Sequence, residues 1–262
     1  KTLAKLKEDP APNLSLCLNS NLGVPWAKVE LLVSEARQLL EEKKIKELGI
    51  FTSLEAWGKR AEFIRSGLDF DLFRGNLEYL LENLPKVPIT FMVTYNALSV
   101  TSFLPLLQYL LQLREKFSAL HGVPSPIFVD ISYLRHPALQ SVQILPESFR
   151  AQVKEAVDYL ADHQASKIGA SWGFYDWELS KMARLHDWMC QPVKEEERDA
   201  ERANFFRYFN EYGKRRGLDF AQVFPEMSAF WEECCALAAK ADALDLQQVR
   251  FAAKSDSLLL TK

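Results

Sequence analysis

The sequence predicts an α/β fold: part of a parallel (β/α) barrel built from four βα units, followed by an α-helical C-terminal extension. Three observations favour this class. Short apolar segments recur at intervals of 35, 40 and 37 residues, and apolar residues at helical spacing lie between them. No strand pattern remains from Pro146 onward. We therefore expect the partial barrel over residues 1–146 and the helical extension over residues 147–262.

The apolar segments are the predicted strands. They cover Leu14–Leu18, Ile50–Thr52, Ile89–Val93 and Ile127–Ile131. Each is apolar without strict alternation, as expected for a strand that is covered on both faces. The intervals between them equal the length of a strand, a crossover helix and two loops. The chain should therefore form consecutive right-handed βαβ units with a parallel sheet.

The predicted helices follow from apolar positions at helical spacing. Three crossover helices have their apolar stripes at residues 29–40, 73–84 and 103–117. In the extension, further stripes occupy residues 149–160, 175–189 and 205–212. The last of these ends in Lys214-Arg215-Arg216-Gly217, a common C-terminal cap. A fourth helix of the extension begins within "LDFAQVFPEMSAFWEECC".

Composition limits the classes of function. The chain has 262 residues, of which 48% are apolar, and its net charge is −3. This near-neutral balance gives no electrostatic footprint for nucleic acid or an anionic membrane, and no apolar run approaches the roughly 20 residues of a spanning helix. Four cysteines are too few for a disulfide scaffold in a chain of this length, which favours a reducing, cytoplasmic setting.

Polar residues follow all four predicted strands. The strand ends read Asn19-Ser20-Asn21, Thr52-Ser53-Leu54-Glu55, Thr94-Tyr95-Asn96 and Asp130-Ile131-Ser132-Tyr133. The carboxyl ends of parallel strands share one rim, where ligands of such folds bind. A ligand with a carboxylate, an amine and a ribose would need an arginine, a hydroxyl or amide donor, and an acid. S-adenosylmethionine is such a ligand.

Four segments, taken in order and spacing, resemble the radical S-adenosylmethionine enzyme family, in the branch with a helical or twitch-type extension that includes peptide-modifying members. They are "LSLCLNSNLGVP", "IFTSLEAWGKRAEFIRSGLDFDLFRGNLEYLLE", "ITFMVTYNALSV" and "IFVDISYLRHPALQSVQILP". They resemble the third to sixth strands of that family's six-strand partial barrel. The tail "FFRYFNEYGKRRGLDFAQVFPEM" is similar in a less specific way.

The resemblance implies roles for three residues at the second strand end. Ser53 would donate a hydrogen bond to the methionyl carboxylate of S-adenosylmethionine, although a capping serine is the alternative. Arg65 would pair with the same carboxylate, with an ordinary ion pair to Glu62 or Asp69 as its alternative. Glu55 would meet the ribose hydroxyls or the ammonium group, or else be a solvated acid.

The other strand ends have weaker implied roles. Asn19 and Asn21 would contact the ligand, although asparagine is also common in turns. Thr94 and Asn96 would face the adenine or the ribose. Asp130 would contact either the ligand or the substrate. Lys59 and Arg60 compete with Arg65 for the carboxylate.

One part of the family pattern is absent. The resemblance implies a [4Fe–4S] cluster held by a Cys-x3-Cys-x2-Cys loop, and nothing matches that loop: Cys17 and Cys190 stand alone, and Cys234 and Cys235 are adjacent. We therefore expect the cluster ligands upstream of Lys1, which would make this chain a fragment that is inactive alone. The family also implies an electron-donor protein and a substrate, with peptides among the candidates.

Two other functions stay open. A non-catalytic half-barrel could bind a second polypeptide along the Leu14–Leu18 strand, because an apolar edge strand without a charge is normally covered. An unrelated lyase or hydrolase could use Glu55 and Asp130, although the chain has no nucleophile elbow or metal motif. The four histidines show no zinc-ligand spacing.

Overall fold

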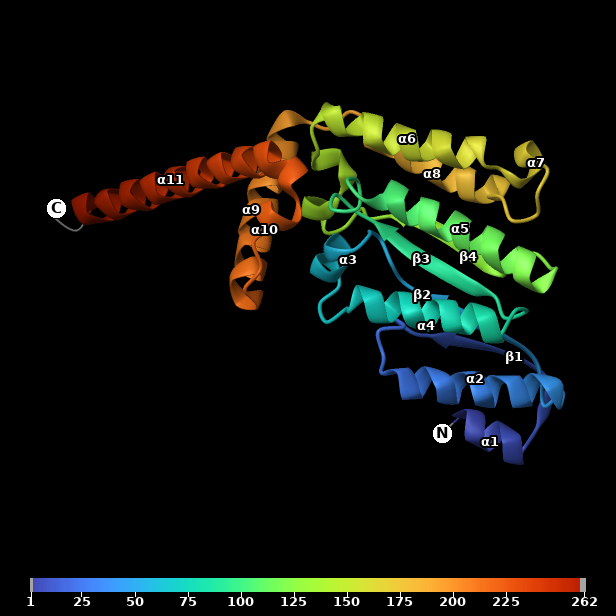
Figure 1. Cartoon of the computed structure of the whole chain (residues 1–262). Helices are drawn as coiled ribbons and strands as arrows, with labels where there is room; N and C mark the ends of the chain where they lie inside the picture. Colours follow the sequence, from blue (N-terminus) through green and yellow to red (C-terminus); the bar gives the residue numbers. More distant parts are fainter. Residues whose placement is uncertain (1, 260–262) are drawn as a thin grey trace.

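The computed structural model describes the backbone of residues 2–259 and the side chains of residues 2–244. It contains a four-stranded, all-parallel sheet in the order β1-β2-β3-β4 (Figure 1). The strands are β1 (Ala11–Asn19), β2 (Ile45–Thr52), β3 (Ile89–Tyr95) and β4 (Ile127–Tyr133). The predicted α/β class and parallel sheet are confirmed, and the architecture is compatible with a partial (β/α) barrel.

A helix connects each strand to the next. The three predicted crossover helices are α2 (Trp26–Glu41), α4 (Phe70–Asn83) and α5 (Phe103–His121). Two short helices were not predicted, α1 (Thr2–Glu8) and α3 (Lys59–Ile64). Six or seven residues are too few to show a helical period in the sequence.

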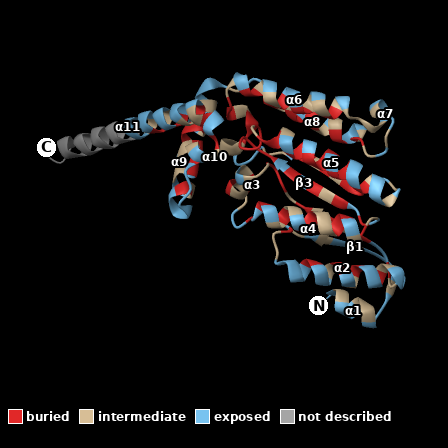
Figure 2. Ribbon diagram, in the orientation of Figure 1, coloured by how far each residue is buried: buried red, intermediate tan, exposed pale blue. Residues whose placement is uncertain are grey.

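The crossover helices leave one face of the sheet open. Leu48 and Ile50 of β2 are buried, whereas the alternate residue Phe51 is half-buried. In β3, Met92 is 38% exposed although its neighbours Phe91 and Val93 are buried. The exposed strip of residues beside buried ones is visible on the ribbon (Figure 2). The prediction that these strands are covered on both faces is therefore wrong, because consecutive right-handed crossovers place their helices on a single face.

The two edges of the sheet differ. Within the described residues β1 pairs only with β2, and its burial is slight along its whole length. At the other edge, the amide of Val129 in β4 donates to Glu178 Oε1 at 2.8 Å. Glu178 belongs to α8 (Asp176–Met189) and also pairs with the fully buried Arg114 of α5. One edge is thus closed by a helix and a buried ion pair, and the other is not.

The C-terminal part of the chain is helical, as predicted. After the 3₁₀ turns η1 (Ala138–Gln140), η2 (Val142–Ile144) and η3 (Glu147–Phe149), its helices are α6 (Arg150–Asp162), α7 (Ala165–Ile168), α8, α9 (Glu195–Arg216), α10 (Phe220–Val223) and α11 (Ser228–Leu259). The predicted fourth helix is broken by η4 (Pro225–Met227), since proline cannot continue a helix. None of the described helices has both the length and the apolar composition needed to cross a bilayer. The domain boundary at 146 stays a prediction.

Besides the contact of α8 with β4, the extension also contacts the sheet-containing part of the chain through α3. The hydroxyl of Tyr212 on α9 donates to the carbonyl of Phe63 at 2.5 Å. Arg60 donates to both carboxylate oxygens of Glu226 in η4, at 2.8 and 2.7 Å. The Phe63 ring also packs among phenylalanines of the extension, including Phe209. The helix that precedes Arg65 is therefore held in place by contacts with α9 and η4 of the extension.

Candidate functional site

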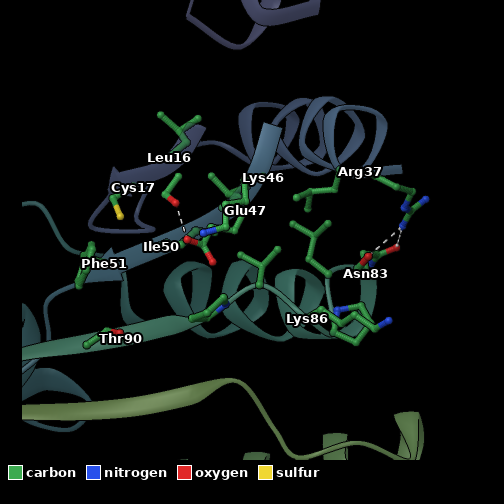
Figure 3. Close-up of a pocket in the computed structure, with 18 of the residues that line it drawn as sticks. Leu16, Cys17, Arg37, Lys46, Glu47, Ile50, Phe51, Asn83, Lys86 and Thr90 are labelled. Carbon is green, nitrogen blue, oxygen red and sulfur yellow. Dashed lines mark hydrogen bonds between the residues drawn. The ribbon is translucent and has the colours of Figure 1, made fainter. Parts of the chain in front are cut away.

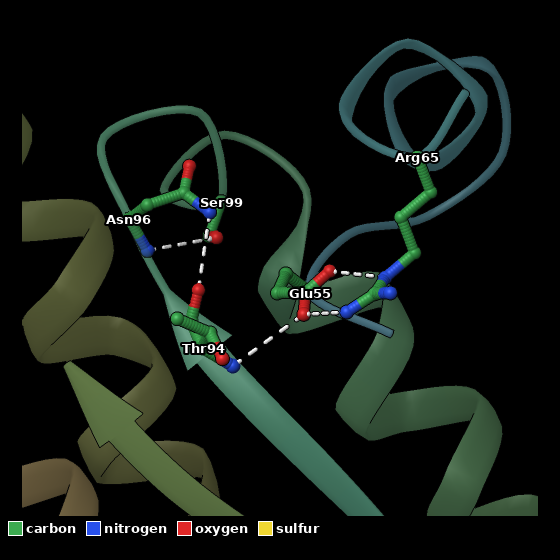
Figure 4. Close-up of polar contacts among 5 residues, drawn as sticks. All are labelled: Glu55, Arg65, Thr94, Asn96 and Ser99. Atoms are coloured by element: carbon green, nitrogen blue, oxygen red, sulfur yellow. Dashed lines mark hydrogen bonds and ion pairs between the residues drawn. The ribbon is translucent and has the colours of Figure 1, made fainter. Parts of the chain in front are cut away.

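Glu55 and Arg65 are in contact at the carboxyl ends of the strands. Glu55 lies just beyond β2 and is only 2% exposed. Arg65 follows α3, and its Nε donates to Glu55 Oε2 at 2.6 Å while its Nη2 donates to Oε1 (Figure 4). A bidentate pair of this kind fixes the plane of the guanidinium group. Glu55 therefore holds Arg65 in position, and neither Glu62 nor Asp69 is its partner.

The path of the chain between β2 and α4 explains the contact. Gly58 directly precedes α3 with a φ of 60°, a left-handed conformation that glycine adopts at little cost. Gly67 turns the chain again with a φ of 79° before α4 begins. The short helix α3 between these two turns returns over the end of β2 and brings Arg65 back to Glu55.

The neighbouring strand end contributes a backbone group. The amide of Thr94, in β3, donates to Glu55 Oε1 at 3.5 Å (Figure 4). Asn96 serves the following turn instead: its Nδ2 donates to the Thr94 carbonyl at 3.1 Å, and its Oδ1 accepts from the Leu98 amide at 3.0 Å. The Asn96 amide in turn donates to Ser99 Oγ. Asn96 therefore shapes the loop after β3, which is the alternative role of a strand-end asparagine.

A cavity of about 350 Å³ adjoins the ion pair. It is lined by Asn21, Glu55, Ile64, Arg65, Ser66 and Leu68. The two hydrogen bonds to Glu55 use two of the five N–H groups of Arg65, and the side chain is 31% exposed, so the other N–H groups remain for a ligand. Ser66 also lines the cavity with a hydroxyl group, and the sequence analysis did not predict it. Its position next to Arg65 in the sequence could have indicated it.

Asn21 enters the cavity from the loop after β1. Its Oδ1 accepts a hydrogen bond from the Gly23 amide at 3.2 Å, which fixes the side chain. The loop is anchored by Asn76 of α4, whose Nδ2 donates to the carbonyls of Leu22 and Val24 at 2.7 and 2.9 Å. Three predicted residues thus meet at one cavity: Asn21 from the first βα unit, and Glu55 and Arg65 from the second.

The remaining predicted residues lie outside the lining of this cavity. Asn19 is the exposed last residue of β1, Ser53 directly follows β2, and the Thr94 side chain is exposed. Asp130 forms an ion pair with Lys181 of α8, at the closed edge of the sheet. All four residues lie at or near the carboxyl ends of the strands, but none of them lines the cavity beside Arg65.

The other cations of α3 are engaged elsewhere. Lys59 pairs with Glu62 at 2.7 Å, and Arg60 pairs with Glu226. Of the three candidates for a ligand carboxylate, Arg65 is the one that lines the cavity beside Glu55.

A metal centre has no ligand set in the part of the chain with described side chains. No group of three or more His, Cys, Asp or Glu residues there could hold a metal ion. The cysteines are dispersed: Cys17 lies on β1, Cys190 follows α8, and Cys234 and Cys235 lie on α11. A [4Fe–4S] cluster therefore does not fit these residues, whereas the cavity beside Arg65 offers both charges and an amide to an amino acid group.

Comparisons with protein-family models, with curated proteins and with solved structures find no match. The function of the chain is therefore inferred from its own residues, above all from the anchored guanidinium of Arg65 and the cavity that it lines.

Proposed function

We propose that this chain binds S-adenosylmethionine as part of a radical S-adenosylmethionine enzyme, with the methionyl carboxylate on Arg65. The observation that carries the proposal is the Arg65 guanidinium, which the buried Glu55 holds beside a small polar cavity. This cavity lies at the carboxyl ends of parallel strands, where open α/β sheets bind their ligands. The order of the four sequence motifs supports the choice of ligand.

The charges of the site suit an amino acid group. The methionyl part of S-adenosylmethionine carries an ammonium and a carboxylate, and the Glu55–Arg65 pair also presents one charge of each sign. Arginine donates to carboxylates in a planar, bidentate geometry. In the proposal, Arg65 binds the ligand carboxylate through N–H groups that Glu55 does not use, and Asn21 contributes its amide. Glu55 acts as a positioning residue, in place of the ribose contact expected from the resemblance.

In a protein of this family, a reduced [4Fe–4S] cluster would supply one electron to the sulfonium of S-adenosylmethionine. Its C–S bond would break to give methionine and a 5′-deoxyadenosyl radical, which would abstract a hydrogen atom from the substrate. Because the described residues do not fit a cluster, our proposal for this chain itself is confined to binding and orienting S-adenosylmethionine. The same proposal includes an electron-donor protein and a substrate.

The test is isothermal titration of the chain with S-adenosylmethionine. The Arg65→Ala variant should weaken binding about tenfold or more, because a hydrogen bond to a charged group contributes about 1.5–3 kcal/mol and about 1.4 kcal/mol is tenfold. Decarboxylated S-adenosylmethionine should bind weakly to the unchanged chain and be insensitive to this substitution. Binding that is unaffected by Arg65→Ala would contradict the assignment, as would an absence of binding.

Arg60→Ala is the matched control. Arg60 lies on the same short helix and also forms a bidentate ion pair, but its partner is Glu226 and it does not line the cavity. We expect Arg60→Ala to leave the affinity for S-adenosylmethionine unchanged. A comparable loss in both variants would show that the helix, and not the guanidinium of Arg65, matters for binding.

A second candidate function is non-catalytic binding of another polypeptide along β1. The observation in its favour is the strand itself, which pairs only with β2 within the described residues and exposes Leu14. An unpaired edge of this length offers a row of backbone donors and acceptors to an added strand.

A further inference from the structure

A larger cavity, of about 710 Å³, lies at the amino ends of the strands, away from Arg65 (Figure 3). It exists because β2 extends further than β3 at this end. The pairing of the two strands begins with Ile50 opposite Ile89, so residues 46–49 of β2 have no partner in β3. The loop at 84–88 forms the opposite wall. The volume falls within the range of small-molecule sites, about 300–1,000 Å³.

The interior of this cavity is mainly aliphatic. Its apolar lining includes Leu16, Leu40, Leu48, Ile50, Leu84 and Val87. Leu48, Ile50, Leu84 and Val87 are almost fully buried and form the floor of the cavity, whereas Leu16 and Leu40 are partly exposed. Burial of an apolar ligand against the exposed part of this lining would be favourable.

The rim carries more cations than anions. Arg37, Lys46 and Lys86 line the cavity together with Glu41 and Glu47. Figure 3 shows Arg37 and Lys86 at one end of it, with Cys17, Phe51 and Thr90 at the other.

These three cations and two anions give the lining a net charge of plus one. Glu47 accepts a hydrogen bond from the hydroxyl of Ser15, and Arg37 Nη2 donates to Asn83 Oδ1 at 2.8 Å. Both Lys46 and Lys86 are exposed, and neither forms an ion pair with any residue of 2–244. The cavity therefore combines an aliphatic interior with a rim of net positive charge.

We infer that this cavity binds a small amphipathic anion, with its apolar body between β2 and the 84–88 loop and its negative group near Lys86, at the end of the cavity that Arg37 also lines. This site is independent of the proposed S-adenosylmethionine site, because the two cavities share no residue. Each can be tested without the other.

Gly49 allows the cavity to be filled without loss of the strand. A Cβ at this position would meet Cys17 Sγ at 3.9 Å and the Pro88 carbonyl at 4.0 Å, which are ordinary contacts. Its φ is not in the left-handed region, and valine is favoured in strands. The side chain of a Gly49→Val variant would therefore enter the part of the cavity beside Cys17 and Pro88, on the open face of the sheet, while β2 keeps its conformation.

The test is a fluorescence titration with 8-anilinonaphthalene-1-sulfonate, an apolar body with one negative group. The unchanged chain should bind one dye molecule, and Gly49→Val should weaken this binding at least about tenfold, the factor for about 1.4 kcal/mol. Gly75→Ala is the control, because its added Cβ on α4 meets nothing within 4 Å. Equal dye binding by Gly49→Val and the unchanged chain would overturn the inference.

Lys86→Gln tests the charge separately and remains informative if Gly49→Val fails to fold. It should weaken 8-anilinonaphthalene-1-sulfonate binding by up to about fivefold, as expected for an exposed charge pair of at most about 1 kcal/mol. It should leave the binding of N-phenyl-1-naphthylamine, the uncharged counterpart, unchanged. Equal effects on both dyes, or an effect on neither, would overturn the assignment of a negative group to this rim.

Discussion

At the scale of single residues, burial separates two adjacent cysteines. Cys234 is fully buried, whereas Cys235 is exposed. Burial raises the pKa of the Cys234 thiol to about 12, and the thiolate is the form that reacts with alkylating reagents. We predict that iodoacetamide at pH 8 labels Cys235 in the folded chain and spares Cys234. Peptide mass spectrometry measures both sites at once, and equal labelling rates in the folded chain would contradict this burial.

The residues of the candidate site were predictable as a group but not in their pairing. The strand ends predicted Asn21 and Glu55, and the family resemblance predicted Arg65. These three residues line one cavity, whereas their roles in ligand binding stay predictions. That Glu55 would bind Arg65 depends on the turns at Gly58 and Gly67, whose φ angles no spacing in the sequence reveals. Each polar residue had two competing roles, and local backbone geometry decided between them.

The partner of Asp130 was not predictable from the sequence either. Its position at a strand end suggested a place beside the ligand, but Lys181 of α8 binds it instead. The two residues lie 51 positions apart in the chain. Contacts at that separation depend on how the extension packs on the sheet, which the apolar periodicity of α8 does not specify.

At the scale of elements, β1 is the strand most open to new contacts. If it docks other polypeptides, the isolated chain should associate with itself through this edge at high concentration. Leu14→Lys places a charge on the edge, which is how natural proteins discourage strand pairing. We predict that this substitution lowers the average mass in light scattering toward that of the monomer.

Leu31→Lys on α2 provides the comparison for this experiment. Leu31 is 59% exposed, so this variant makes the same chemical change on a helix and away from the sheet edge. It should not alter the association. A monodisperse monomer of the unchanged chain at every concentration would argue against β1 as a docking edge.

Helices were predicted correctly where they are long enough for apolar residues to repeat at helical spacing. The helices α2, α4 and α5 have 14 residues or more and were predicted from their apolar stripes. Strand β2 was predicted only from Ile50, although it begins at Ile45, because its first half contains Lys46 and Glu47. Lys46 and Glu47 line the cavity at the amino ends of the strands. The residues of β2 that the prediction left out are therefore the ones that have no partner in β3.

At the scale of the whole molecule, buried phenols and a buried thiol make stability depend on alkaline pH. Burial raises the pKa values of Tyr95 and Tyr109, the latter to about 12, and that of Cys234. The folded state therefore holds these protons more tightly than the unfolded state does. Their contribution is complete below about pH 9, the ordinary pKa of a thiol, and is lost progressively as the pH rises toward 12.

We predict that the free energy of unfolding falls between pH 9 and 12, as measured by urea denaturation. Tyr95→Phe should reduce this fall, because it removes a phenol whose pKa burial raises. The Tyr95 hydroxyl is also buried without a hydrogen-bond partner among the described residues. For the same reason, this variant should be at least as stable as the unchanged chain at pH 7. An unchanged alkaline slope in Tyr95→Phe would contradict the assigned role of this phenol.

The intervals between strands were enough to predict the parallel α/β architecture. The lack of strict alternation wrongly predicted that both faces would be covered, because apolar residues also lie on the open face. Met92 and Phe51 illustrate this: both are apolar, and both lie on the open face.

The contrast between the two edges has a consequence for growth of the sheet. The amide of Val129 is already bound to Glu178, and α8 lies beside β4, so a strand arriving there would have to break a contact that also neutralises the buried Arg114. A strand arriving at β1 would break no such contact. Within the described residues, addition of a strand would therefore be less costly at the β1 edge than at the β4 edge.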